Sequence, residues 1–223
     1  MKRLIIFDLD GTLVNAYPAV SRSVNYTLKA LGFKPQTHAE IKRSVGRGDR
    51  HLMAQFVGEQ LAEEAIRLYR PHHARALAAP GGVKFLPGAA GLLKALKKDG
   101  HQLAIASNRP TKFTLSILKI LDARKYFDVV LCADRAPRPK PYPDMLRAIL
   151  EKLKVSGPEA LYVGDMTIDV ETGHSAGIRT VAVTTGSSRI LELKALKPWR
   201  VIGRINQLQT IMGESNVQKV TQR

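Results

Sequence analysis

The sequence predicts an α/β protein with a Rossmann-like parallel sheet, helices on both faces of the sheet, and a small helical cap inserted after the first strand. Three observations support this fold class. From Leu86 onward, short apolar runs alternate with helical periodicity, as in a parallel sheet with crossover helices. Polar or acidic residues follow the ends of several apolar runs. The segment between the first strand and Leu86 has helical spacing and no convincing strand.

The elements of the predicted core follow in order along the chain. Residues 3–7 predict the first strand, because a parallel strand buried on both faces has a continuous apolar run. Four later runs predict buried strands: Leu103 to Ala106, Val129 to Ala133, Leu161 to Val163 and Thr180 to Val183. Helical spacing is seen around Leu92, Ile117 and Ile149. We expect further helices over 190–196 and 205–212 and a frayed end over 215–223.

Residues 15–82 are expected to form a helical cap over the edge of the sheet at which the first strand ends. Apolar residues recur at helical spacing from Val20 to Leu31 and from Leu61 to Leu68. Residues 14–17 and 80–82 are the expected hinges, since Gly and Pro clusters separate regular elements. The predicted domains are an α/β core of residues 1–14 and 83–223 and a cap of residues 15–82.

Composition and charge argue against several classes of protein. The single cysteine, Cys132, lies in an apolar run, so neither a disulfide framework nor a cysteine zinc site is expected. No stretch is long enough to cross a bilayer and no targeting segment is evident, so we expect a cytoplasmic protein without a membrane partner. The net charge of +16 favours anionic ligands. The basic residues are scattered without a nucleic-acid-binding module, so we expect no specific nucleic-acid partner, and either a monomer or a homodimer.

Two acids directly follow the first strand. Asp8 and Asp10 are two residues apart on an extended segment, so their side chains point the same way and their charges require a cation or a shared proton. A solvated Asp-x-Asp-Gly turn is the alternative for this tetrapeptide alone. In open α/β sheets, ligands bind at this edge, which favours a metal site or acid/base chemistry.

Three further polar signals follow later strands. Ser107 ends a strand and precedes a helix, which suits either an anion site or an ordinary helix cap. Lys140 lies between two prolines. The prolines indicate either a structural loop or a rigid segment that holds the lysine against a phosphate or a pair of carboxylates. Asp165 and Asp169 form a second acid pair, and a helix cap explains only one of them.

Together these signals resemble the four motifs of the haloacid dehalogenase superfamily of phosphohydrolases, in the order of that family. The four are Asp8-x-Asp10-Gly11-Thr12, then Ser107, then Lys140, then Gly164-Asp165-x-x-x-Asp169. The resemblance covers nearly the whole chain and includes a small helical cap. Three further stretches are most similar to the phosphoglycolate phosphatases of this superfamily: Ser107-Asn108-Arg109-Pro110, Val45-Gly46-Arg47-Gly48 and Ala176-Gly177-Ile178.

The resemblance implies a magnesium-dependent phosphatase that works through an aspartyl phosphate. Asp8 is then the nucleophile, and Asp10 the general acid and later the base. The implied Mg²⁺ ligands are the carboxylates of Asp8 and Asp165 and the backbone carbonyl of Asp10. Asp169 is expected not to bind the metal directly but to orient waters at Asp165 or to pair with Lys140. Three histidines are expected at the surface or in cap packing rather than on a metal: His51, His72 and His73.

The resemblance also implies a phosphate site and substrate contacts. Ser107, the backbone N–H of Asn108 and Lys140 are expected to hold phosphate oxygens, and Thr12 to brace the first motif. Arg47, in a glycine-flanked loop of the cap, is the leading candidate for a contact to the organic part of the substrate. Arg109 is a second candidate, for the substrate or for the cap.

A small, anionic phosphorylated metabolite is the expected substrate, and 2-phosphoglycolate is the leading choice. Its second negative group suits two arginines in a strongly basic protein. Pyrophosphate, nucleotides and sugar phosphates remain alternatives, as does phosphoryl transfer of the β-phosphoglucomutase kind. A dehalogenase of this fold lacks the second acid of the first motif, and Asp10 is present. A non-catalytic binding protein normally lacks one of the motif carboxylates, and none is missing.

Overall fold

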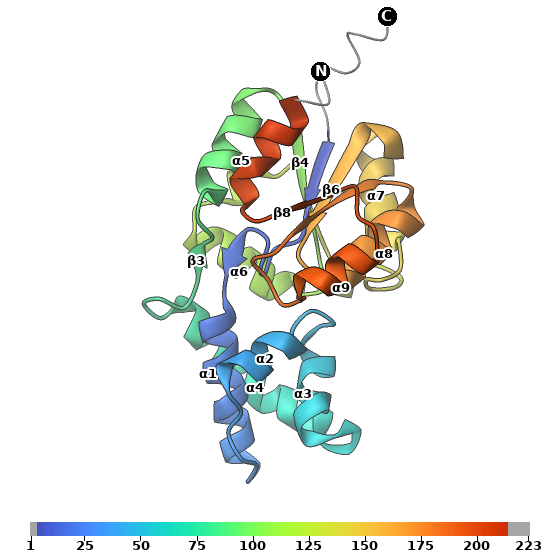
Figure 1. Ribbon diagram of the computed structural model, residues 1–223. Helices are drawn as coiled ribbons and strands as arrows, with labels where there is room; N and C mark the ends of the chain where they lie inside the picture. The colour runs from blue at the N-terminus through green and yellow to red at the C-terminus, as the bar shows by residue number, and fades with distance from the viewer. Residues whose placement is uncertain (1–3, 214–223) are drawn as a thin grey trace, which may run out of the picture.

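A six-stranded parallel sheet forms the centre of the computed structural model, which describes residues 4–213 (Figure 1). The strand order is β5-β4-β1-β6-β7-β8, and the predicted fold class is confirmed. The bounds are β1 Leu4–Phe7, β4 Gln102–Ser107, β5 Val129–Cys132, β6 Ala160–Gly164, β7 Arg179–Val183 and β8 Arg200–Ile202. Phe7 at the end of β1 pairs with Ile105 and Val163. The segments after β1, β4 and β6 therefore meet at one edge of the sheet.

Helices cover both faces of this sheet. Successive residues of a strand point to opposite faces: Ile5 packs in an apolar cluster with Leu92 of α5, whereas Ile6 packs in a second cluster with Met145 of α7. The helices of the core are α5 Ala89–Lys98, α6 Thr111–Ile120, α7 Asp144–Leu153, α8 Thr167–Ala176 and α9 Ile190–Ala195. Short 3-10 turns span Arg124–Tyr126, Ala133–Arg135, Gly157–Glu159 and Ile205–Gln207.

Four helices between β1 and α5 form a group of their own, which we call the four-helix segment. Its members are α1 Tyr17–Ala30, α2 His38–Ser44, α3 Asp49–Val57 and α4 Ala62–Ala78, with a 3-10 turn over Glu59–Leu61. They have a separate apolar cluster that includes Val24, Ile41 and Tyr69. Figure 1 shows the segment beyond the edge of the sheet where β1 ends, which is the edge that the acids of the first motif follow.

The structure differs from the sequence-based expectations at short strands. β2 (Val14–Asn15) and β3 (Lys84–Phe85) pair in antiparallel fashion where the four-helix segment leaves and rejoins the core, and no strand was predicted there. β8 was also not predicted. Strands of two or three residues are too short to show a periodicity. The helix expected over 205–212 begins with a 3-10 turn and is α-helical over 208–213, and the expected frayed end over 215–223 lies outside the described residues.

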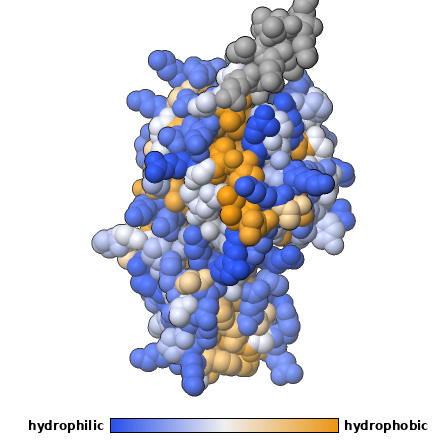
Figure 2. Space-filling model, viewed as in Figure 1, coloured by the Kyte–Doolittle hydropathy of each residue, from blue (hydrophilic) through white to orange (hydrophobic). Residues whose placement is uncertain are grey.

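Figure 2 shows one face of the molecule, coloured by hydropathy. Hydrophilic side chains cover most of that face, around a band of hydrophobic residues on the α/β core (Figure 2). Within residues 4–213, none of the helices combines the length and the apolar character needed to cross a membrane.

Candidate active site

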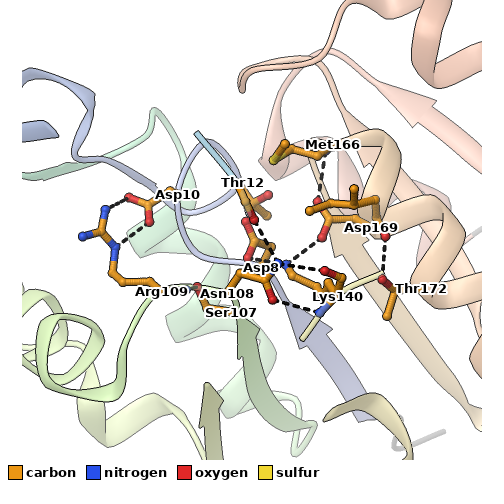
Figure 3. A network of polar contacts seen from close by, with 12 residues as sticks. Asp8, Asp10, Thr12, Ser107, Asn108, Arg109, Lys140, Met166, Asp169 and Thr172 are labelled. Atoms are coloured by element: carbon orange, nitrogen blue, oxygen red, sulfur yellow. Dashed lines mark hydrogen bonds and ion pairs between the residues drawn. The ribbon is translucent and has the colours of Figure 1, made fainter. Parts of the chain in front are cut away.

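The ends of three adjacent strands bring the predicted site residues together (Figure 3). Asp8 follows β1, Ser107 ends β4 and Asp165 follows β6. Lys140 reaches the same place from the loop before α7, and Asp169 from the first turn of α8. The parallel strand order is the reason, because β1 lies between β4 and β6.

Lys140 lies at the centre of a buried polar cluster. Its Nζ donates to Asp8 Oδ1 and to Asp169 Oδ1, each at 2.7 Å, and to the Tyr162 hydroxyl at 3.1 Å. The Tyr162 hydroxyl in turn donates to Asp169 Oδ1 at 2.7 Å. Burial opposes the charge of Lys140, but Asp169 and Asp8 outweigh burial and hold the lysine pKa well above its usual value. Lys140 is therefore a fixed cation beside the Asp8 carboxylate.

Asp165 is completely buried in a tight cradle. Thr12 Oγ1 donates to Asp165 Oδ1 at 2.9 Å, and the amide of Ser187 donates to Oδ2 at 3.0 Å. A Cβ atom placed on Gly186 would lie only 1.6 Å from Asp165 Oδ2, and one placed on Gly11 2.7 Å from it. Both glycines therefore allow the chain to approach the carboxylate closely, which fixes the position of Asp165.

The carboxylates of the site form a group that suits a cation. Oxygen atoms of Asp8, Asp165 and Asp169 lie within 4.8 Å of one another. Within residues 4–213, Lys140 is the only direct partner of these carboxylates that carries a balancing charge. Burial raises the pKa of Asp8 to about 7 against the opposing charge of Lys140, and burial together with the charge of Asp8 also raises the pKa of Asp165. Such an excess of buried negative charge, offered by oxygen atoms alone, fits a hard divalent cation.

Asp169 differs from the other two carboxylates in its hydrogen bonds. Its Oδ1 accepts from Lys140 and Tyr162, and its Oδ2 accepts from the amides of Asp165 (3.2 Å) and Met166 (3.0 Å) at the start of α8. Both oxygens are therefore occupied by donors of the chain. This arrangement suits a carboxylate that orients Lys140 and the Asp165 segment, rather than one that binds an ion directly.

Asn108 connects three parts of the site. Its side chain donates to the carbonyl of Lys140 at 3.1 Å and to the carbonyl of Gly46 at 3.0 Å, and it accepts from the amide of Lys140 at 2.9 Å. Asn108 thus ties the end of β4 to the lysine loop and to the four-helix segment. The sequence analysis assigned a role only to its backbone N–H. The neighbouring Ser107 is buried, and its Oγ accepts from the amide of Arg109 at 3.2 Å.

Asp10 points away from Asp8 and toward Arg109 (Figure 3). Arg109 binds both of its carboxylate oxygens, with Nε 2.7 Å from Oδ2 and Nη2 3.0 Å from Oδ1. On its other side, Nη1 of Arg109 donates to His73 Nε2 of α4 at 2.7 Å. Burial, followed by the charge of Arg109, lowers the pKa of His73 to about 2, so this ring is neutral.

A cavity between the four-helix segment and the core includes these groups. Core residues on its wall include Asp8, Ser107 and Lys140, and Tyr69 and His73 line it from α4. Arg47 is not among its lining residues: its side chain is exposed, while the glycines on either side of it line the cavity. In this arrangement Arg109, and not Arg47, is the arginine that faces the site.

Sequence reasoning missed three residues that contact the predicted site. Tyr162 is hidden in the apolar run of β6, and Ser187 lies in a loop without a motif. His73 was expected at the surface or in cap packing; it is buried, stacks on Tyr69 and meets Phe113 edge-on. Its contact with Arg109 joins residues 36 positions apart in the sequence, and no local pattern marks such a pair.

Comparisons with known proteins identify a matching family and similar proteins. Residues 5–183 match the sequence model of the haloacid dehalogenase-like hydrolase family. The chain is 32% identical to a phosphoglycolate phosphatase of Psychrobacter arcticus, over 88% of this chain and 90% of that protein. It is also 32% identical to a phosphoglycolate phosphatase of Aquifex aeolicus, over 82% of this chain and 85% of that protein.

Solved structures resemble the whole fold, including the four-helix segment. The crystal structure of a predicted phosphoglycolate phosphatase from Haemophilus somnus has a TM-score of 0.87 at 26% identity, over 95% of this chain and 98% of that one. CbbY from Rhodobacter sphaeroides, solved in complex with phosphate, has a TM-score of 0.79 at 26% identity, over 93% of this chain and 96% of that one.

Proposed function

Since the chain belongs to the haloacid dehalogenase-like hydrolase family and is a phosphatase, we propose that it hydrolyses a small anionic phosphomonoester, with 2-phosphoglycolate as the leading substrate. The observation that carries the proposal is the Asp8 carboxylate, which faces the cavity 2.7 Å from the ammonium of Lys140 and next to Asp165. The names of the two relatives at 32% identity support the choice of substrate.

In the proposed reaction, Asp8 attacks phosphorus and forms an aspartyl phosphate, while the ester oxygen leaves with a proton from Asp10. A water molecule then attacks the phosphorus, Asp10 accepts its proton, and Asp8 is regenerated with release of phosphate. Splitting one displacement into two steps lets one carboxylate serve as nucleophile and the other as acid and base. Lys140 keeps Asp8 oriented and balances its charge.

We propose Mg²⁺ as the cofactor, held by the carboxylates of Asp8 and Asp165 and the backbone carbonyl of Asp10. The bound ion supplies positive charge beside the nucleophile and the transferring phosphoryl group. Asp169 holds Lys140 in place, and Thr12 holds Asp165 through the 2.9 Å hydrogen bond. The oxygen-only donor set and the excess negative charge support this assignment.

The remaining parts of the proposal concern binding and domains. Ser107, the Asn108 amide and Lys140 hold the phosphate oxygens, and the four-helix segment acts as a cap, with residues 15–82 as cap and residues 1–14 and 83–223 as core. Arg47 remains a candidate for substrate contact if the cap moves. We also propose a cytoplasmic enzyme, monomeric or dimeric, without a specific nucleic-acid partner.

Asp8→Asn tests the proposed function. The substitution keeps the shape of the side chain and removes the nucleophile, so phosphate release from 2-phosphoglycolate with Mg²⁺ should fall by roughly a thousandfold or more. Asp99→Asn, an exposed acid at the end of α5, is the matched control and should retain activity. A folded Asp8→Asn variant with near-normal turnover would refute the covalent mechanism. A different outcome, transfer of phosphate to a second hydroxyl instead of water, would indicate a phosphotransferase.

A further inference from the structure

The ion pair between Arg109 and Asp10 has a consequence for the proposed reaction. Both carboxylate oxygens of Asp10 accept from the guanidinium, and the two side chains are almost fully buried, at 9% and 11% exposed. A bidentate pair of this kind fixes the carboxylate in one orientation. Held by Arg109, Asp10 faces away from Asp8 (Figure 3), so it must leave Arg109 before it can reach the ester oxygen.

Arg109 is held in place independently of Asp10. Its Nη1 donates to His73 Nε2 at 2.7 Å. A guanidinium has no acceptor, so His73 Nε2 carries the lone pair and Nδ1 carries the proton. That Nδ1 lies 3.3 Å from Ser23 Oγ, and Ser23 donates to the carbonyl of Ala19 at 2.7 Å. The chain of hydrogen bonds anchors Arg109 to α1 and α4 when Asp10 departs.

A second anion in the cavity has one cation available to it. Among the described residues that line the cavity, the lysines and arginines are Lys140 and Arg109. Lys140 is shared by Asp8 and Asp169. Asp49 also lines the cavity, but Arg70 outside it binds both of its oxygens, at 2.7 and 3.2 Å. An additional carboxylate on the substrate would therefore be drawn to Arg109.

We propose that Arg109 is the specificity-determining residue: the carboxylate of the substrate replaces Asp10 on its guanidinium, and this exchange frees Asp10 to act on the ester oxygen. The inference rests on the proposed function and deepens it, since it restricts the substrate to phosphomonoesters with a carboxylate near the ester oxygen. A neutral leaving group offers Arg109 no replacement partner. Releasing Asp10 would then leave a buried guanidinium unpaired, which is strongly unfavourable.

Binding of two inert analogues tests the recognition step. 3-Phosphonopropionate keeps the phosphonate and the carboxylate, whereas propylphosphonate has the same chain length without the carboxylate. By calorimetry with Mg²⁺, the wild-type protein should bind the first at least tenfold more tightly. Arg109→Met should reduce the ratio to near one, and Lys112→Met, an exposed neighbour on α6, should leave it unchanged. An unchanged ratio in Arg109→Met would overturn the proposal.

Asp10→Asn tests the exchange itself. If the ligand carboxylate displaces Asp10, removing the charge of Asp10 should tighten 3-phosphonopropionate binding several-fold and leave propylphosphonate unaffected. The gain should vanish when Arg109→Met is combined with Asp10→Asn. A gain that persists in the double variant would indicate simple repulsion by Asp10, and no gain in the single variant would indicate that no exchange occurs. Either result would overturn the proposal that the ligand carboxylate displaces Asp10.

Kinetics separates this inference from the proposed function. Wild-type kcat/KM should be higher for 2-phosphoglycolate than for ethyl phosphate, and p-nitrophenyl phosphate, whose leaving group needs no acid, reports phosphatase activity of the wild type without the exchange. Arg109→Met should lose the preference for 2-phosphoglycolate, and Lys112→Met should keep it. Absence of phosphatase activity on all three esters would reject the proposed function. A preference retained in Arg109→Met would reject only the inference. If Arg109→Met fails to fold, Arg109→Lys serves instead, because one ammonium cannot bind a carboxylate bidentately and the ratio should fall several-fold.

Discussion

At the scale of single residues, Lys140 is the cation on which two buried carboxylates depend. Asp8 and Asp169 both accept from its ammonium at 2.7 Å, and the exposed fractions of all three side chains are 8% or less. Charges in such positions are tolerated when they are paired and hydrogen-bonded. The same residue therefore serves the stability of the site and the proposed orientation of the nucleophile.

Lys140→Met should consequently impair both folding and activity. Leaving two buried carboxylates without their partner should lower the free energy of unfolding by about 3 to 5 kcal/mol, as measured by urea denaturation. Adding Asp8→Asn should recover part of this loss, because one of the unpaired charges is then absent. Lys97→Met, which removes a partly exposed pair with Asp128, should cost about 1 kcal/mol or less. Equal losses of unfolding free energy in Lys140→Met and Lys97→Met would contradict the role of Lys140 as the partner of two buried carboxylates.

At the scale of elements, α2 connects the four-helix segment to the loop that supports Asp165. Arg43 of α2 donates to the Ser187 carbonyl at 2.8 Å and binds both carboxylate oxygens of Glu192, and Lys42 donates to the Thr185 carbonyl at 3.2 Å. The amide of Ser187 holds Asp165. The position of the proposed cap is therefore coupled to the position of a proposed metal ligand.

Arg43→Ala should loosen this contact with little effect on global stability. The Arg43–Glu192 pair is exposed, so its loss should change the free energy of unfolding little. We expect kcat/KM for 2-phosphoglycolate to fall several-fold and amide exchange over residues 184–188 to accelerate. Arg50→Ala removes a comparably exposed arginine that pairs with Glu59 and Glu63 inside the four-helix segment, and should change neither quantity. Identical behaviour of the two variants would argue against the coupling.

At the scale of the whole molecule, the net charge of +16 produces a field that attracts anions. The charge is spread over the chain, and hydrophilic side chains cover most of the face seen in Figure 2. The field therefore acts on substrate encounter in general, whereas selection among anions depends on the few cations inside the cavity.

Salt should weaken this general attraction. Raising the ionic strength from about 0.02 M to about 0.5 M shortens the screening length several-fold, so KM for 2-phosphoglycolate should rise by roughly threefold to tenfold. The rise should be smaller for p-nitrophenyl phosphate, which carries one negative group fewer, while kcat changes little for either substrate. A KM that is insensitive to salt would show that the net charge has no part in substrate capture.

The sequence by itself determined the fold class and marked the charged residues of the polar cluster. Continuous apolar runs predicted strands β1, β4, β5, β6 and β7, because strands buried on both faces select apolar residues locally. Motifs at the ends of β1 and β6 marked Asp8 and Asp165, and a proline-framed motif in the loop that follows β5 marked Lys140. Parallel strand order then brings such positions to one edge. Each of these features is encoded within a few consecutive residues.

Only the tertiary structure decided how the side chains pair. Arg109 and Asp10 are 99 positions apart, and nothing near either residue specifies that one binds both oxygens of the other. In the same way, the solvent exposure of Arg47, expected to contact the substrate, and the contact of His73 with Arg109 depend on where the four-helix segment lies. Ion pairs and hydrogen bonds form between whichever groups packing brings within about 3 Å, so a one-dimensional pattern can identify the groups but not their partners.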